Sequence, residues 1–206
     1  MVYDEILKRE IPDGWKSGIA SDLFCFNPSL SLPANQAASY IDMNSLPVSG
    51  FMTKKPDTKL FGGGVKFQNG DVAVARITPC LENGKTGLIT MLDDGEIGFG
   101  STEFIIIRGK DRSLSAFASM LSRSASFRQF AILNMTGTSG RKRIEAKVME
   151  LFGLPIPPKD ILDSYEELVR PLFKKMTVNA TQNEELTVLR DWLLPVLMNG
   201  QVTVEM

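Results

Sequence analysis

The sequence contains no histidine. This absence excludes Ser-His-Asp and Cys-His catalytic sites and zinc sites of the His-Glu-x-x-His type. Only two cysteines are present, Cys25 and Cys80, and their wide separation predicts free thiols in a reducing, cytoplasmic setting. No apolar run approaches the roughly 20 residues that span a bilayer, and residues 1–5 lack the features of a secretion signal, so no membrane partner is expected.

The charge is nearly balanced overall but unevenly distributed. The net charge is −1, yet residues 108–147 carry nine cations and two anions, a net of +7, which leaves −8 for the remainder. Such asymmetry is typical of a localised phosphate-binding face, and it also fits a solvated helix surface. Charge alone leaves both interpretations open.

The first two thirds of the chain alternate between strand and turn signals. Residues 11–15 predict an initial turn with Trp15 packed onto the domain, and residues 62–64 predict a flexible glycine loop. Short apolar runs rich in β-branched residues predict strands at residues 71–77, 86–92 and 103–108. Apolar residues then recur at helical spacing from 113 to 134, with a break at 122–126. The fold class expected is mixed α/β with a β-rich domain.

Three prolines in residues 154–158 predict a stiff, extended connector, because proline fixes φ and removes a backbone donor. We place the domain boundary there, with residues 1–155 as one domain and residues 156–206 as connector and long helix. Ser164 and Glu167 are spaced as a capping box at the helix start. Pro171 is expected in or near the first turns, and Pro195 with Asn199-Gly200 is expected to end the helix.

Apolar residues in this helix follow a seven-residue repeat that is typical of a coiled coil. A helix from about 161 to 197 would be roughly 55 Å long, too long to bury its apolar stripe on a domain of this size. We therefore expect a partner helix. The expected interface residues are Tyr165, Leu168, Leu172, Leu186, Leu189 and Leu193, with Val196 in the same repeat and Lys175, Asn179 and Gln182 as polar insertions.

Four segments resemble, in the same order, segments of the specificity subunit of type I restriction–modification enzymes. They read GDVAVARITPCLENGK at residues 70–85, GFGSTEF at 98–104, MTGTSGRKR at 135–143 and LRDWLLPVLMNG at 189–200. The likeness covers most of one half of a full-length subunit, which has two recognition domains and two spacer helices. After Pro158 the chain departs from a common form of the family, with Lys159-Asp160 where acidic residues and glutamine are usual.

The resemblance implies a non-catalytic subunit that reads one half of a bipartite double-stranded DNA target in a prokaryotic cell. Its expected partners are methyltransferase subunits, restriction/translocase subunits, and a second copy or another half-subunit bound through the C-terminal helix. S-adenosylmethionine, ATP and Mg²⁺ are then expected on partner subunits, and no cofactor on this chain. A rod of roughly 55 Å corresponds to about 16 base pairs, and self-pairing implies an interrupted palindrome.

The side chains of these segments suit DNA binding. The cations can neutralise phosphates, the small residues of 136–140 allow close backbone approach, and polar loop residues can read base edges. For Glu82 and Glu103 we favour the alternative that the carboxylates orient arginines or cap turns. The predicted DNA-binding residues are Arg76, Thr78, Glu82, Asn83, Gly84, Lys85, Ser101, Thr102, Ser139, Gly140, Arg141, Lys142 and Arg143.

Other functions are less well supported. A protein-interaction scaffold with weak DNA affinity remains the main alternative. A nuclease motif would start at Pro56-Asp57, but Glu82-Asn83-Gly84-Lys85 has one residue too many for its second half. An adenine methyltransferase motif at Asn27-Pro28 lacks the aromatic residue that stacks on a flipped base.

Overall fold

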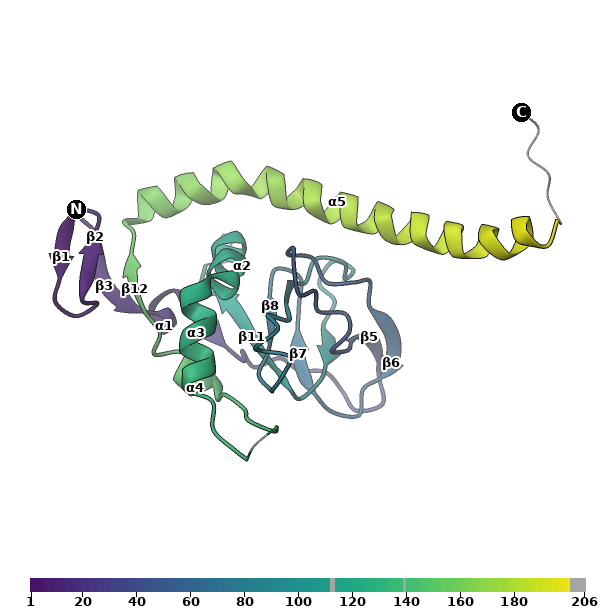
Figure 1. Cartoon of the computed structure of the whole chain (residues 1–206), viewed down its shortest axis with the longest axis horizontal. Coiled ribbons are helices and arrows are strands. Elements are labelled where there is room, and N and C mark those ends of the chain that lie inside the picture. The colour runs from purple at the N-terminus through teal and green to yellow at the C-terminus, as the bar shows by residue number, and fades with distance from the viewer. Residues whose placement is uncertain (112–113, 139, 201–206) are drawn as a thin grey trace.

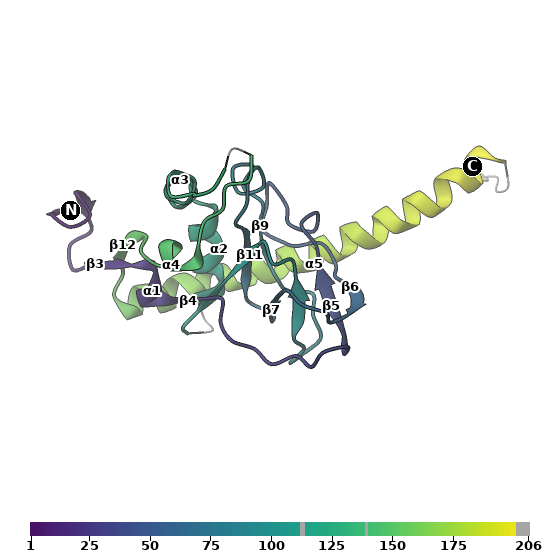
Figure 2. The ribbon, with the colours of Figure 1, turned by 90° about the horizontal axis from the view of Figure 1, so that it is seen from below.

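The computed structural model describes residues 1–111, 114–138 and 140–200. A β-rich body is followed by one long helix, α5 (Lys159–Met198), which runs along one side of the body and extends beyond it (Figure 1). We call residues 1–158, which precede α5, the head. The view in Figure 2 shows the same arrangement from below, with the far end of α5 projecting away from the head. The expected mixed α/β class with a long C-terminal helix is confirmed.

The central sheet of the head is antiparallel, and all four residues of β8 are buried. Alternate residues of β8 face opposite ways: Val72 and Val74 join one apolar cluster, whereas Ala73 and Ala75 join another. The three predicted strands are confirmed, the first and second being shorter than expected. In order across the sheet the strands are β4 (Phe24–Phe26), β11 (Phe104–Gly109), β8 (Val72–Ala75) and β9 (Thr86–Leu88).

A second sheet packs beside the first. At β10 the backbone of the second sheet comes close to Phe104 of the first sheet. A Cβ on Gly100 would lie 2.7 Å from the carbonyl oxygen of Ile41 and 2.8 Å from the ring of Phe104, so only glycine fits there. The β5–β10 pair is parallel and the other pairs are antiparallel. The strand order is β6 (Asp57–Leu60), β5 (Ala37–Ile41), β10 (Gly98–Gly100) and β7 (Val65–Phe67).

Helices cover the other face of the central sheet. The predicted break in the 113–134 stretch is confirmed, because α2 (Ser115–Arg123) ends where α3 (Ala125–Leu133) begins. Between them Ser124 adopts an extended conformation, and its hydroxyl accepts the N–H of Phe127 at 3.2 Å. Two single-turn helices complete the head, α1 (Ala20–Leu23) and α4 (Ala146–Met149).

Both ends of the head meet next to the start of α5. The hairpin of β1 (Val2–Asp4) and β2 (Arg9–Ile11) lies at the N-terminal end (Figure 1). The proline-rich connector is extended, as predicted, but it forms a strand, β12 (Gly153–Ile156), paired antiparallel with β3 (Lys16–Ile19). Trp15 is half-buried. The division into residues 1–155 and 156–206 stays a prediction.

Several details of the predicted helix boundaries are wrong. The helix begins at Lys159 after Pro158, so Ser164 lies inside it and the Ser164–Glu167 capping box does not form the start. Pro171 and Pro195 both lie within the helix. Packing of residues on either side of Pro171 against the head offsets the loss of one backbone hydrogen bond. The predicted end at Asn199-Gly200 is confirmed.

One side of α5 packs on the head and another is exposed. Leu162 is buried, and Phe173 packs against the main apolar cluster. The helix lies along the head over much of its length. The predicted apolar stripe nevertheless stays largely open to solvent, with Leu168 73% and Leu186 61% exposed, so the prediction that the head alone cannot bury this stripe is confirmed. No helix in the described ranges is long and apolar enough to cross a membrane.

Candidate nucleic-acid interface

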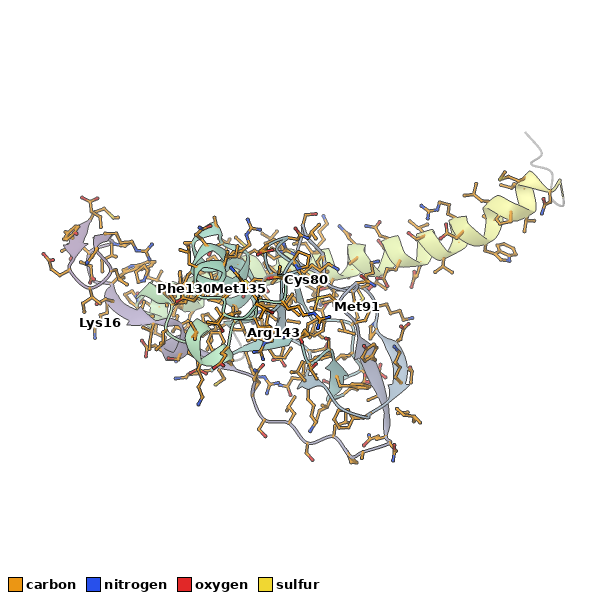
Figure 3. All side chains as sticks on the ribbon, turned by 60° about the horizontal axis from the view of Figure 1, so that its bottom comes forward. Lys16, Cys80, Met91, Phe130, Met135 and Arg143 are labelled. Atoms are coloured by element: carbon orange, nitrogen blue, oxygen red, sulfur yellow. The ribbon has the colours of Figure 1, made fainter. Side chains whose placement is uncertain are left out.

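Two of the loops singled out in the sequence lie against each other. The N–H of Thr78 donates to the carbonyl of Lys142 at 3.1 Å, and the N–H of Ile144 donates to the carbonyl of Arg76 at 3.0 Å. We call the surface formed by residues 76–85, 135–138 and 140–143 the two-loop face. It lies on the side of the head away from α5, where the loop after α3 extends downward in Figure 1. Figure 3 turns this side toward the viewer, with Cys80 and Arg143 labelled.

The first loop is a compact turn that follows β8. The N–H of Leu81 donates to the carbonyl of Ile77 at 3.0 Å, and the N–H of Lys85 donates to the carbonyl of Cys80 at 3.0 Å. These bonds leave Glu82 and Asn83 exposed at the tip. The loop therefore presents an amide and a carboxylate on a fixed backbone, as base-edge reading requires.

Gly84 and Lys85 have largely structural surroundings. Gly84 is buried with a φ of +74°, and a Cβ there would lie 2.6 Å from the guanidinium of Arg128. The ammonium of Lys85 donates to the carbonyl of Met43 at 2.9 Å, which directs it toward the neighbouring loop. Their predicted DNA contacts remain predictions.

The second loop closes on itself and carries the exposed cations. Thr136 and Arg143 exchange both backbone hydrogen bonds, at 2.9 and 2.8 Å. Arg141 and Lys142 are exposed between them, and within the described residues neither forms an ion pair. Gly140 is exposed with a φ of +79°. Ser139, also predicted to contact DNA, lies outside the described residues.

Arg143 differs from its two neighbours because Glu103 holds it. Its guanidinium donates to both oxygens of the Glu103 carboxylate at 2.7 to 3.0 Å. This hydrogen bond lowers the pKa of Glu103, partial burial opposes the shift, and the charges of Arg143 and Arg76 add to it. The same pair raises the pKa of Arg143. The interpretation that Glu103 orients an arginine is confirmed.

The remaining predicted residues frame this pair. The hydroxyl of Ser101 accepts the N–H of Glu103 at 3.1 Å, and Thr102 next to it is exposed. Arg76 is half-buried, and its Nε has no hydrogen-bond partner in the described part of the chain. Thr78 is fixed by its backbone bond to Lys142. The structure thus gathers the GFGSTEF segment beside the two-loop face.

The sequence analysis missed the role of Arg123, one of the nine cations in residues 108–147. Its guanidinium donates to the carbonyls of Pro47, Val48, Gly84 and Thr86, so it ties two loops to α2. Burial lowers the pKa of Arg123, and the nearby charge of Arg128 adds to this. Its position at the end of a helix gives no signal of this role, because the acceptors come from loops distant in sequence.

Three of the cations in residues 108–147 are therefore engaged by partners within the head. Arg108 donates to both oxygens of the buried Asp71 at 2.6 Å, Arg123 bonds backbone carbonyls and Arg143 is paired. The exposed cations that remain at the two-loop face are Arg141 and Lys142. The prediction of a phosphate-binding face thus rests on fewer side chains than the net charge of residues 108–147 suggests.

No metal site is apparent for a nuclease. Among the described residues there is no group of three or more Cys, Asp or Glu side chains that could hold a metal ion. Asp57 lies in β6, at the edge of the second sheet, while Glu82 is at the tip of the first loop.

Comparison with curated proteins identifies relatives. No protein-family model matches the chain. The specificity subunit of the Escherichia coli type I restriction enzyme EcoAI is 32% identical over 165 residues, covering 76% of this chain and 28% of that protein. The EcoEI specificity subunit, also from Escherichia coli, is 29% identical over 155 residues, covering 72% of this chain and 26% of that protein. The chain thus spans about a quarter of the length of these relatives.

Solved structures share the fold over nearly the whole chain. The HsdS subunit from Thermoanaerobacter tengcongensis superposes with a TM-score of 0.57 at 18% identity, covering 89% of this chain and 48% of that one. The S subunit of the type I restriction–modification system from M. genitalium gives a TM-score of 0.53 at 14% identity, covering 91% and 47%. In sequence and in fold, the chain belongs with the specificity subunits of type I restriction–modification enzymes.

Proposed function

We propose that the chain recognises double-stranded DNA in a sequence-specific way, as a half-subunit of a type I restriction–modification enzyme. The observation that carries the proposal is the two-loop face. Two segments more than 50 residues apart are hydrogen-bonded together on the side of the head away from α5, and they carry exposed polar and cationic residues. Specificity subunits are non-catalytic, and we assign no reaction to this chain.

Each part of the face has a distinct role in the proposal. Arg141 and Lys142 contact phosphates and provide affinity that depends on salt. Asn83 and Glu82 reach base edges in the major groove, where an amide pairs with adenine and a carboxylate accepts from cytosine. The ion pair of Arg143 with Glu103 fixes the guanidinium so that it approaches DNA in one orientation.

We further propose that α5 pairs with a second copy or with another half-subunit, so that two heads read two half-sites. Exposed leucines along the helix support this, because an unpaired stripe of this length is unfavourable in water. Tyr165 faces the head instead, with its ring 6.1 Å from that of Phe117. Self-pairing through two-fold symmetry gives an interrupted palindrome as the target.

The partners follow from this placement. Methyltransferase subunits bind S-adenosylmethionine, and restriction/translocase subunits use ATP and Mg²⁺. This chain recognises the DNA sequence that directs both kinds of subunit to their target. A protein-interaction scaffold would not need an exposed cationic loop fixed against a polar one. The exposed Arg141 and Lys142 therefore favour DNA recognition over the scaffold.

Methylome sequencing tests the proposal. The chain is expressed with its methyltransferase subunit in cells that lack both, and modified bases are mapped across the genome. We expect one bipartite motif whose methylation requires the chain. Variants with Glu82 or Asn83 changed to alanine should alter or abolish methylation at that motif. Assembly of the complex without any motif-dependent methylation would refute the proposal and favour the scaffold.

A further inference from the structure

The buried carboxylate of Glu166 lies at the joint between α5 and the head. It is only 3% exposed and accepts the N–H of Phe117, in α2, at 2.9 Å. The neighbouring residue Tyr165 packs its ring edge-on against Phe117. Two consecutive residues of α5 thus contact the first turn of one head helix.

This carboxylate does what a capping residue does, but it comes from another helix. The first N–H groups of a helix lack partners within the helix, and Leu114 at the cap position of α2 provides no side-chain acceptor. A negative charge at this end also interacts favourably with the helix dipole. Burial raises the pKa of Glu166, while its bond to Phe117 opposes the shift. A carboxylate is costly to bury unless it makes specific, directional contacts.

Two further contacts lie along the same side of α5. The rings of Phe51 and Phe173 lie 5.3 Å apart, and the N–H of Lys55 donates to both carboxylate oxygens of Glu184 at 2.7 and 2.9 Å. The head segment that carries Phe51 and Lys55 is itself held to α2 by Arg123, which donates to two of its carbonyls. The helix therefore contacts the head at several points between Leu162 and Glu184.

We propose that Glu166 is a positioning residue that fixes the angle between the head and α5. This inference rests on the proposed function. If Glu166 fixes the angle between the head and α5, that angle and the length of the helix together set the gap between the two half-sites. Of the 40 residues of α5, those after Glu184 lie past the last hydrogen bond to the head among the described residues, which corresponds to about 20 Å of helix at about 1.5 Å per residue. Counting base pairs along the whole helix thus overestimates the free length of the spacer.

A fixed joint should make DNA binding sensitive to the gap. One base pair of change moves a half-site by about 3.4 Å along the duplex and rotates it by about 35° around it. Two rigidly mounted heads can follow this only by twisting or bending the DNA, which weakens binding. Heads on loosened joints can follow the half-sites with less deformation.

The first test measures binding to duplexes whose half-sites, taken from the mapped motif, are separated by the native gap or by gaps one and two base pairs longer or shorter. Glu166→Ala removes the acceptor, and Glu166→Leu removes it while refilling the volume, so the test does not depend on the alanine variant folding. Glu166→Gln keeps an acceptor for Phe117. Glu167→Ala, at an exposed position of the same turn, is the matched control.

We expect the parent, Glu166→Gln and Glu167→Ala to lose about tenfold or more in affinity when the gap changes by two base pairs. Glu166→Ala and Glu166→Leu should lose about threefold or less, with binding to a single half-site unchanged. A purely structural role would weaken binding to every duplex alike. Gap preference as sharp in both acceptor-free variants as in the parent would overturn the proposal.

A second test does not involve DNA, so it separates this inference from the proposed function. Spin labels are placed on the exposed Cys25 in the head and on Arg190→Cys in α5, with Cys80→Ser, and excess unlabelled chain confines the signal to intramolecular distances. We expect a narrow distance distribution for the parent and Glu166→Gln. In Glu166→Leu it should become about twofold broader or more. Equal widths would overturn the inference even if the chain binds DNA as proposed.

Discussion

Replacing Arg141 and Lys142 together by alanine should reduce the salt dependence of DNA binding. Both side chains are exposed on the two-loop face, and neither forms an ion pair within the described residues. The loop backbone is held by bonds between Thr136 and Arg143 and between Thr78 and Lys142, none of which involves the replaced side chains. The double variant should therefore keep its fold and lose only its phosphate contacts.

The expected magnitude follows from counterion release. Each phosphate contact contributes about 0.9 to the slope of log affinity against log salt concentration on duplex DNA, so two lost contacts reduce the slope by about 1.8. Over a fourfold increase in salt, the parent should then lose about 12-fold more affinity than the variant. Most of this difference should be common to specific and random duplexes, because phosphate contacts carry little sequence information.

The assay is fluorescence anisotropy of a labelled duplex at several salt concentrations, with the target motif and with a scrambled duplex. The matched control is Lys8→Ala with Arg9→Ala, which removes the same two charges from the exposed N-terminal hairpin. We expect the control to keep the parental slope. An unchanged slope in Arg141→Ala/Lys142→Ala, or an equal decrease in the control, would refute the assignment of the phosphate-binding face.

Three further predictions concern stability. Because Arg143 lowers the pKa of Glu103, their interaction stabilises the fold above the unfolded pKa of Glu103 and is lost as pH falls through the folded pKa. Glu103→Gln should therefore remove this pair's contribution to the fall of the melting temperature at acidic pH. A melting temperature that falls just as steeply in the variant would argue against the pair. Asp71→Ala leaves Arg108 without its partner and should lower the free energy of unfolding by about 3–5 kcal/mol in urea titrations, where a loss below about 1 kcal/mol would contradict this. Pro171→Ala restores a backbone donor inside α5 and should raise the unfolding free energy by about 1–3 kcal/mol, whereas a decrease would mean that the proline suits a bend.

Local patterns in the sequence were sufficient for many elements of the fold. Short apolar runs rich in β-branched residues predict the buried strands β8 and β11, whose side chains divide between two apolar clusters. The helix break at Ser124 and the long C-terminal helix follow from the same kind of pattern. Helix ends were less well predicted, since Pro171 and Pro195 both lie inside α5 although proline usually marks a helix boundary.

The sequence by itself determined the strand and helix content, the polar and cationic loop residues, and an apolar stripe on the last helix. Only the tertiary structure decided which cations remain exposed, because Arg108 and Arg143 find carboxylates far away in the chain and Arg123 finds carbonyls. It also decided that one side of α5 packs on the head through Glu166. The physical reason is that periodicity records which residues share a face, whereas the partner of that face depends on long-range contacts.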